Sequence, residues 1–327
     1  REGSILHRPD VVAEAGKTNL DLNRLSREIT AFQNERPQAA ILQSVASGIF
    51  SGDYWNARLR SYEALSYSGY KAGFITEKQA AEGGLQAYRL LIVPAASRVD
   101  PATLSGIRTF VEQGGQVLLV GSHALELEPR GAAQSAEDRG YVFDHAAKIH
   151  AETASAVQIR DALKPILNAI DPLHVTLKET ASGELPYNVE WRSVDLDGRR
   201  MLNIVNYGDS PVAVEAFLGN DGTSGNSAIS GFADLITGET LAGTELVLEP
   251  LTPYLLEFAA APEEPETSVL QGIAELPRID RVAAGTEKTA AELGLPTFSE
   301  ATRDDPVVNR RAKRPPYRGD RRPKGPP

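Results

Sequence analysis

The chain has 327 residues, of which 41% are hydrophobic, and this is enough for two ordinary domains with buried cores. Its formal net charge of −10 argues against nucleic-acid and membrane partners, and no apolar run approaches the ~20 residues that span a bilayer. The absence of cysteine excludes disulfides, thiolate metal sites and a cysteine nucleophile. We see no signal peptide after Arg1 and therefore favour a cytoplasmic location, and the start without methionine leads us to expect a fragment.

Residues 1–37 predict a loop followed by one amphipathic helix. Thr18, with Asp21 three residues later, is typical of a helix start, and Pro37 closes the helix. The apolar residues between them follow helical spacing: Leu22, Leu25, Ile29 and Phe32. One such helix is too small to be a domain, so we interpret this segment as a linker.

Residues 38–172 alternate short apolar runs with helical patterns. The runs AAILQSV, KAGFIT, YRLLIVPAAS and QVLLV predict four strands, and GYVFDHAAKI predicts a further one. A run that is apolar throughout is typical of a strand buried on both faces. Repeated strand–helix–strand units imply right-handed crossovers and a parallel sheet. We therefore predict an α/β domain with a flavodoxin-like parallel sheet and helices on both faces.

The helices of this region are marked by caps and by spacing. In the clearest case Asp100 is the N-cap, Pro101 is the first helical residue, and Gly114 and Gly115 end the helix. An earlier helix is indicated by Trp55, Leu59, Tyr62 and Leu65. A later one, with a bend expected at Pro165, is indicated by Val157, Leu163, Leu167 and Ile170.

Residues 173–260 have the pattern of antiparallel strands. Asp197-Gly198 separates two strand-like runs and is a strong signal for a two-residue hairpin. Further alternating runs follow, so we predict a small β-sandwich. Residues 261–327 are rich in Pro, Glu, Ala and Arg, and from Arg303 onward they carry nine basic and three acidic residues. Such a composition predicts a disordered tail.

The strand end at Gly121-Ser122-His123 is the strongest candidate for chemistry, because several hydrolases hold a nucleophile in a turn after a buried strand. The nucleophile elbow requires glycine two residues before and after the serine, and Val120 and Ala124 stand there instead. Adjacent side chains on an extended segment point apart. We therefore expect that His123 does not act as a base for Ser122.

Two short motifs resemble other kinds of site. Residues 15–18 read AGKT, the end of a phosphate-binding loop, but Val11 stands where that loop needs its first glycine. Asn34-Glu35 resembles the acid/base pair of retaining glycosidases, yet it ends an amphipathic helix and not a barrel strand. Glycosidase chemistry also needs a second carboxylate about 5–10 Å away, and the sequence marks none.

The remaining polar and aromatic candidates fit structural roles. His145 and His150 are spaced for neither a helical nor a strand metal pair. The other histidines are His7, His123 and His174. Trp55 and Trp191 are expected in the core or at an interface. We interpret Glu112, Glu126 and Glu128 as surface charges. The sequence therefore predicts no catalytic, cofactor-binding or metal-binding residue and no cofactor.

The order of these motifs resembles one family over residues 1–260. The stretch YRLLIVPAASRVDPATLSGIRTFVEQGGQVLLVGS resembles the trimerisation domain of glycoside hydrolase family 42 β-galactosidases, which is similar to class I glutamine amidotransferases. The stretches WRSVDLDGRRMLNIVNYGDSPVAVEAFL, DLITGETL and LVLEPLTPYLLEF resemble their small C-terminal β-domain. The segment HRPDVVAEAGKTNLDLNRLSREI resembles the connection from their catalytic barrel.

This resemblance implies a fold but no catalytic residue. The family hydrolyses sugars with two glutamates on strands of a (β/α)8 barrel that precedes these domains, and no position of this chain corresponds to either. In the amidotransferase comparison the nucleophilic cysteine falls near Gly121 or Ser122. Because the chain has no cysteine, amidotransferase chemistry is excluded.

The leading hypothesis is therefore a non-catalytic part of a β-galactosidase-like enzyme, which assembles copies into a homo-oligomer, a trimer by resemblance, and helps to wall the neighbouring active site. The parent reaction would be retaining hydrolysis of terminal β-galactosides or related sugars, with carbohydrate bound through the missing barrel. Two alternatives remain open: a free-standing serine-type hydrolase that uses Ser122, and a carbohydrate-binding or scaffolding protein.

Overall fold

A computed structural model describes residues 8–170, 173, 175–219 and 228–258. Residues 1–264 form one compact unit. The predicted tail at 261–327, His7 and His174 lie outside the described residues. Among the helices that are described, none has the length and apolar character needed to cross a lipid bilayer. The domain boundaries at residues 37, 172 and 260 remain predictions.

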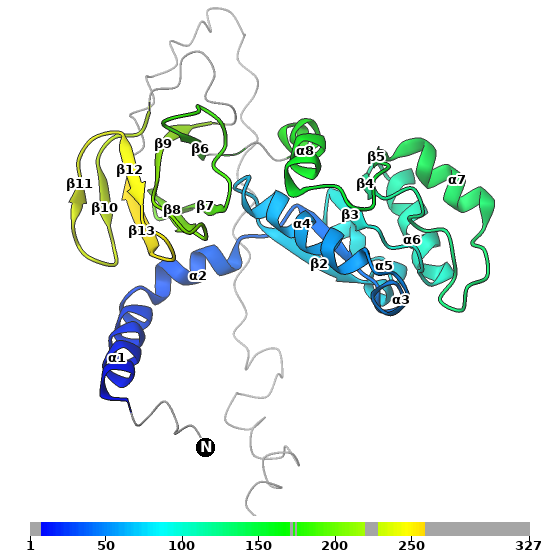
Figure 1. The fold of residues 1–327 in the computed structure, drawn as a ribbon, viewed down its shortest axis with the longest axis horizontal. Helices are drawn as coiled ribbons and strands as arrows, with labels where there is room; N and C mark the ends of the chain where they lie inside the picture. The colour runs from blue at the N-terminus through cyan, green and yellow to red at the C-terminus, as the bar shows by residue number, and fades with distance from the viewer. Residues whose placement is uncertain (1–7, 171–172, 174, 220–227, 259–327) are drawn as a thin grey trace, which may run out of the picture. The chain divides into compact units, whose positions relative to one another are not determined.

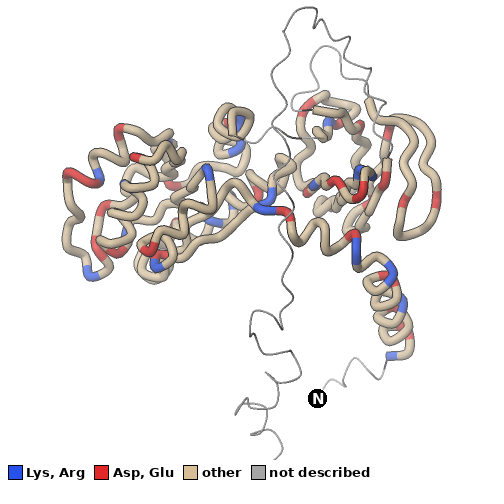
Figure 2. The backbone as a smooth tube through the Cα atoms, turned by 180° about the vertical axis from the view of Figure 1, so that it is seen from behind, with Lys and Arg blue, Asp and Glu red and all other residues tan. Residues whose placement is uncertain are grey.

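Two helices, α1 (Pro9–Arg24) and α2 (Ser26–Asn34), begin the described chain (Figure 1). The predicted helix start at Thr18 is wrong, because the helix begins at Pro9, which favours a first turn. Thr18 lies inside α1, where its hydroxyl donates to the carbonyl of Glu14 at 2.9 Å. Helix α1 buries none of its residues and carries charges of both signs (Figure 2). Helix α2 ends before Pro37, as predicted.

Five strands form a parallel sheet in the order β2-β1-β3-β4-β5. They are β1 (Ala39–Gln43), β2 (Ala72–Thr76), β3 (Leu90–Pro94), β4 (Gln116–Val120) and β5 (Ala147–Ile149). Strand β3 is buried along its whole length, as its continuous apolar run predicts. The predicted α/β class with a parallel sheet is confirmed.

Helices cover both faces of this sheet (Figure 1). They are α3 (Val45–Phe50), α4 (Tyr54–Ser66), α5 (Glu77–Ala81), a 3₁₀ helix (Gly84–Ala87), α6 (Pro101–Glu112), α7 (Ala136–His145) and α8 (Ala156–Ile170). Successive residues of a strand point to opposite faces. Leu119 of β4 accordingly packs in one core with Leu104 of α6, and Leu118 packs in the other core with Leu163 of α8.

Helix α6 has the two ends that its sequence predicts. The Asp100 carboxylate accepts a hydrogen bond from the backbone N–H of Ala102 at 2.9 Å. Gly114, with φ +89°, ends the helix in the left-handed conformation. A Cβ on Gly115 would lie 2.4 Å from the ring of Phe110, so the second glycine is required for close packing.

The strand predicted at residues 140–149 is largely a helix. Residues 140–145 belong to α7, and only residues 147–149 form strand β5. The Ser135 hydroxyl accepts a hydrogen bond from the N–H of Asp138 at 3.2 Å, and Glu137 adds a second acidic side chain in the first turn. These local signals for a helix outweigh the β-propensity of YVF.

Residues 175–258 form two antiparallel sheets, with the orders β11-β10-β13-β8-β7 and β12-β9-β6. Their strands are β6 (Val175–Glu179), β7 (Val189–Leu196), β8 (Arg199–Asn206), β9 (Val212–Leu218), β10 (Phe232–Asp234), β11 (Thr240–Leu241), β12 (Glu245–Leu248) and β13 (Pro253–Phe258). One shared core joins the two sheets, with Trp191 and Leu256 from the first and Leu177 and Val214 from the second.

The predicted hairpin at Asp197-Gly198 is confirmed. Both residues have positive φ, +53° and +78°, and they connect β7 directly to β8. Trp191 of β7 is buried, as predicted, and it meets the parallel-sheet region at Gly69. A Cβ on Gly69 would lie 2.6 Å from the indole nitrogen, so this glycine is needed where the chain leaves α4.

Candidate functional site

The carboxyl end of β4 turns sharply at Gly121, which has φ +91°. This left-handed conformation disfavours any side chain, and a Cβ there would lie 3.1 Å from the Cγ of Glu152. The N–H of Gly121 donates to the carbonyl of Ile149 at 2.7 Å. The turn is therefore as sharp as the strand ends that hold nucleophiles in hydrolases, but the residue at its corner is a glycine.

Ser122 and His123, which follow Gly121, bind two different carboxylates. The hydroxyl and the backbone N–H of Ser122 donate to Oε1 of Glu152 at 2.9 and 3.0 Å. Nδ1 of His123 lies 2.7 Å from Oε2 of Glu126. The two side chains are thus held apart, although residues 122–125 form a turn and not the extended segment that the sequence predicts. This geometry does not supply the hydrogen-bonded nucleophile–base pair of a serine hydrolase.

Glu152 is a poor candidate for the missing base. The hydrogen bond from the Ser122 hydroxyl is the largest cause that lowers the pKa of the Glu152 carboxyl, and backbone N–H donors lower it further. A general base works best when its pKa lies near the operating pH. The structure therefore uses Glu152 to hold the turn in place.

The other predicted motifs occupy structural positions. Residues 15–18 lie inside α1 and follow no strand, so no phosphate cradle forms there. Asn34 is the last residue of α2, and Glu35 follows it as the C-cap. Nδ1 of His145 lies 2.8 Å from the carbonyl of Tyr141. Within the described ranges, no three His, Asp or Glu side chains gather in a way that could hold a metal ion.

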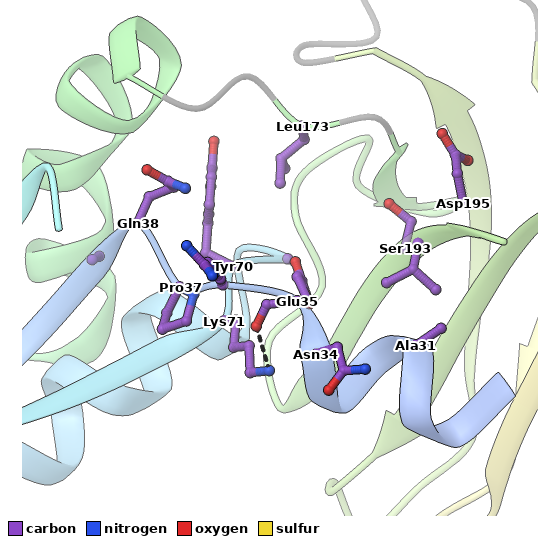
Figure 3. A pocket seen from close by; sticks show the side chains of 14 residues that line it. Ala31, Asn34, Glu35, Pro37, Gln38, Tyr70, Lys71, Leu173, Ser193 and Asp195 are labelled. Carbon is purple, nitrogen blue, oxygen red and sulfur yellow. Dashed lines mark hydrogen bonds between the residues drawn. The ribbon is translucent and has the colours of Figure 1, made fainter. Parts of the chain in front are cut away.

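A polar pocket of about 480 Å³ lies where α2, the starts of β1 and β2, and strand β7 meet (Figure 3). Asn34, Gln38 and Ser193 bring amide and hydroxyl groups to its lining. In Figure 3, Lys71 and Asp195 lie on opposite sides of the pocket. The pocket is therefore built from hydrogen-bonding groups around a single lysine.

Lys71 serves the fold at this pocket. Its ammonium donates to the carbonyls of Phe32, Gln33 and Glu35 at 3.0, 2.8 and 2.7 Å. Figure 3 shows the bond to Glu35. These acceptors lie at the C-terminal end of α2, where a cation is favourable. Burial is the largest cause that lowers the pKa of Lys71. With three carbonyl acceptors around it, this ammonium joins α2 to β2.

The largest exposed apolar surface of the parallel-sheet region is made by α3 and α4. We call it the α3–α4 face, and its side chains are between 51% and 76% exposed: Val45, Ile49, Phe50, Trp55 and Leu59. Next to it, a groove of about 590 Å³ runs between α3 and the residues that begin α5 and α6. Exposed patches of large apolar side chains mark interaction sites in soluble proteins.

The local chemistry of α3 turns its apolar residues outward. The hydroxyls of Ser44 and Ser47 both donate to the carbonyl of Arg98, at 2.7 and 2.6 Å, and hold the polar side of α3 against the protein. A Cβ on Gly48 would lie 2.8 Å from the Trp55 ring, so the glycine lets this ring lie against α3. The Trp55 indole N–H donates to the carbonyl of Gly48 at 2.7 Å.

Cations flank the aromatic rings of the α3–α4 face. The guanidinium of Arg58 lies 4.4 Å from the centre of the Trp55 ring, and that of Arg98 lies 4.9 Å from the centre of the Phe50 ring. Sequence reasoning missed this surface, because α3 is short and because helical spacing alone left Trp55 open to either the core or an interface. The sequence signal that remains is the run of large apolar residues after the serine cap.

No protein-family profile matches the chain, and no curated protein matches it. Solved structures do. An exo-carrageenase of glycoside hydrolase family 42 from Bacteroides ovatus aligns with TM-score 0.65 and 24% identity, over 79% of this chain and 34% of that one. The family 42 β-galactosidase Gan42B from G. stearothermophilus aligns with TM-score 0.50 and 14% identity, over 69% of this chain and 41% of that one.

A β-galactosidase from Bacillus circulans sp. alkalophilus aligns with TM-score 0.51 and 13% identity, over 77% of this chain and 46% of the other. The chain thus spans less than half the length of each of these three proteins. At these identities the likeness establishes a shared fold. The fold of the chain is that of one part of family 42 glycoside hydrolases.

Proposed function

We propose that this chain is the non-catalytic, assembling part of a glycoside hydrolase similar to the family 42 β-galactosidases. The fold likeness to part of such enzymes supports this, and so does the glycine at the strand end that could have held a nucleophile. The parent reaction would be retaining hydrolysis of terminal β-galactosides or related sugars. The two catalytic carboxylates would lie on a barrel that precedes these residues.

The finer fold class belongs to the same proposal. The strand order β2-β1-β3-β4-β5 is the flavodoxin-like order of doubly wound sheets, and it supports a relationship to amidotransferase-like trimerisation domains. The two antiparallel sheets share one apolar core, which supports a β-sandwich.

The α3–α4 face is the observation that carries the assembling role. Oligomer interfaces are rich in aromatic residues and arginine at their centres, and this face combines Phe50 and Trp55 with Arg58 and Arg98. Glu77, at the edge of the adjoining groove, supplies charge of the opposite sign. Because this face carries charge of both signs, we assign the partner as another copy of this chain. In the proposed trimer, which also walls the neighbouring active site, the face would meet a different surface of the next copy.

Analytical ultracentrifugation of the whole chain tests the assembling role. We expect the wild type to form an oligomer and Ile49→Asp to weaken association at least 100-fold, because the carboxylate must be desolvated at the interface. Val247→Asp is the matched control, since Val247 is a similarly exposed valine, at 53%, on β12. A monomeric wild type at ~100 μM, or equal effects of the two substitutions, would contradict the proposal.

The coding sequence upstream of Arg1 tests the enzymatic parent. We expect several hundred preceding residues with a repeating β/α pattern, and β-galactoside hydrolysis by the longer product but not by this chain alone. A start codon immediately before Arg1 would refute the parent while leaving self-association open to the sedimentation test. Hydrolysis by this chain alone would refute the non-catalytic assignment.

A further inference from the structure

A second cavity, of about 570 Å³, lies between helices α1 and α2 and the sheet that contains β7, β8 and β13. Its walls are mostly apolar: Leu22, Leu25, Ile29, Phe32, Ile236 and Leu255. Three of these belong to helices, Leu25 joins α1 to α2, and two belong to the antiparallel region, so the cavity is a cleft between packed elements. Its volume lies within the range of about 300–1,000 Å³ that is usual for small-molecule pockets.

Two cations line this cavity, Arg192 and Lys71. The Arg192 charge contributes, after burial, to the lowered pKa of Lys71, so the two cations lie within electrostatic reach of each other. Lys71 already donates to three carbonyls of the α2 end. Arg192 is therefore the cation that can take a ligand.

Arg192 has unused hydrogen-bonding capacity. Its Nε is buried and forms no hydrogen bond among the residues that the structure describes, and no carboxylate there forms an ion pair with it. The one acid at the cavity, Asp21, is paired with Arg24 at 2.9 Å. Glu190, two residues before Arg192 on β7, accepts a hydrogen bond from the Tyr62 hydroxyl at 3.2 Å. The Nε itself is out of reach of a ligand, so a carboxylate in the cavity would bind the outer nitrogens of the Arg192 guanidinium, whose charge no described carboxylate pairs.

We propose that this pocket binds a small monocarboxylate with an apolar body. The carboxylate binds the Arg192 guanidinium, and the apolar body lies between Phe32 and Ile29 of α2 and Leu255 of β13. The pairing follows from chemistry, because guanidinium matches a carboxylate in a planar fork and the remaining wall offers mainly hydrocarbon. The site needs no catalytic barrel and no second copy, so its test is independent of the test of the proposed assembling role.

Titration of the whole chain with octanoate, followed by NMR, tests the site. We expect saturable binding to one site, at least tenfold weaker binding in Arg192→Gln, and binding of the uncharged analogue 1-octanol at least tenfold weaker than that of octanoate. Arg200→Gln is the matched control, because Arg200 lies on the neighbouring strand with Asp195 as its partner at 3.5 Å, and it should change affinity less than twofold.

A second variant keeps the test decisive if Arg192→Gln fails to fold. Leu22 lies on the cavity wall and is half exposed, so Leu22→Glu places a repelling carboxylate there with little effect on folding. Asn23→Glu adds the same charge on the adjacent exposed position outside the cavity wall. Octanoate binding should be lost in Leu22→Glu and kept in Asn23→Glu. No binding by the wild type, equal binding of octanol, or unchanged binding in Leu22→Glu would overturn the proposal.

Discussion

Two regions lie at the carboxyl edge of the same parallel sheet and differ in what they present. After β4, the side chains of Ser122 and His123 are each held by a carboxylate, and Gly121 presents none. After β1, the serines of α3 turn inward and leave the α3–α4 face open. In open α/β sheets this edge is where ligands bind. Here the polar groups after β4 hold the turn through hydrogen bonds, and the large exposed side chains after β1 are apolar.

The comparison indicates that the same edge of this fold can serve association in place of catalysis. A reactive strand end needs a nucleophile with a free base, and a docking surface needs apolar side chains that the fold itself leaves exposed. The strand end after β4 lacks a nucleophile with a free base, whereas the α3–α4 face has exposed apolar side chains. Substitutions in the two regions should therefore change different measurable properties.

Gly121→Ala should have the largest effect on stability. An alanine at φ +91° is strained, and its Cβ would approach Glu152, so we expect a loss of about 1–3 kcal/mol in the free energy of unfolding. Urea denaturation measures it. Gly140→Ala is the control, because Gly140 lies inside α7 with nothing within 4 Å of its added Cβ, and alanine there should stabilise by about 0.5–1 kcal/mol. Equal effects at the two sites would show that the strand-end turn is not constrained.

Gly48→Ala should act on association. Its Cβ would meet the Trp55 ring at 2.8 Å and push the ring away from α3, so we expect roughly tenfold weaker self-association, which corresponds to about 1.4 kcal/mol. Sedimentation measures the association. Gly16→Ala, inside α1 with no neighbour within 4 Å, should leave association unchanged. If Gly48→Ala associates as strongly as the wild type, Trp55 is not part of the interface.

Local signals in the sequence predicted much of the fold. The strand runs, the Asp100 cap, the Gly114-Gly115 stop and the Asp197-Gly198 hairpin depend on a few neighbouring residues, and all appear in the structure. Helices α3 and α5 and strand β6 were missed, because each has at most six residues and little periodicity. Thr18 and residues 140–145 were misassigned where a helix start lay upstream, marked by Pro9 in the first turn of α1 and by the Ser135 cap of α7.

The candidate sites were harder to predict, because they depend on long-range contacts. Helical spacing indicates that Trp55 and Leu59 share a stripe with Leu65, but it does not indicate which part of the stripe another element covers. The cavity beside Arg192 joins α2 to strands far along the chain. The role of Ser122 was predictable only in part. Its separation from His123 was expected, but from an extended segment that is in fact a turn, and Glu152 comes from a later loop.

Glu152→Gln should make the stability of the strand end depend less on pH. Hydrogen bonds from Ser122 lower the pKa of Glu152 below the ordinary value of 4.5, so its carboxylate stabilises the folded state above that value. We expect the wild type to be more stable than the variant by about 1 kcal/mol at pH 7. The difference should disappear as the pH falls through the lowered pKa. Urea denaturation at pH 7 and at pH 3 measures it, and Glu82→Gln, outside this turn, should show no such change.

Ser122→Ala should have the smallest effect on stability. The same variant distinguishes the proposed assembling role from a serine hydrolase. The hydroxyl gives Glu152 one of two bonds from this residue, and the backbone N–H at 3.0 Å remains, so we expect a stability loss of about 0.5 kcal/mol.

If Ser122 were catalytic, its substitution would instead remove nearly all hydrolysis. Ester and glycoside assays on matched samples decide between these outcomes. Because His123 is bound to Glu126 and Glu152 has a lowered pKa, neither of these neighbours among the described residues is suited to activate the hydroxyl. Hydrolysis at background level in both proteins is the expected result. Hydrolytic activity that is present in the wild type and lost in the variant would show that Ser122 is catalytic.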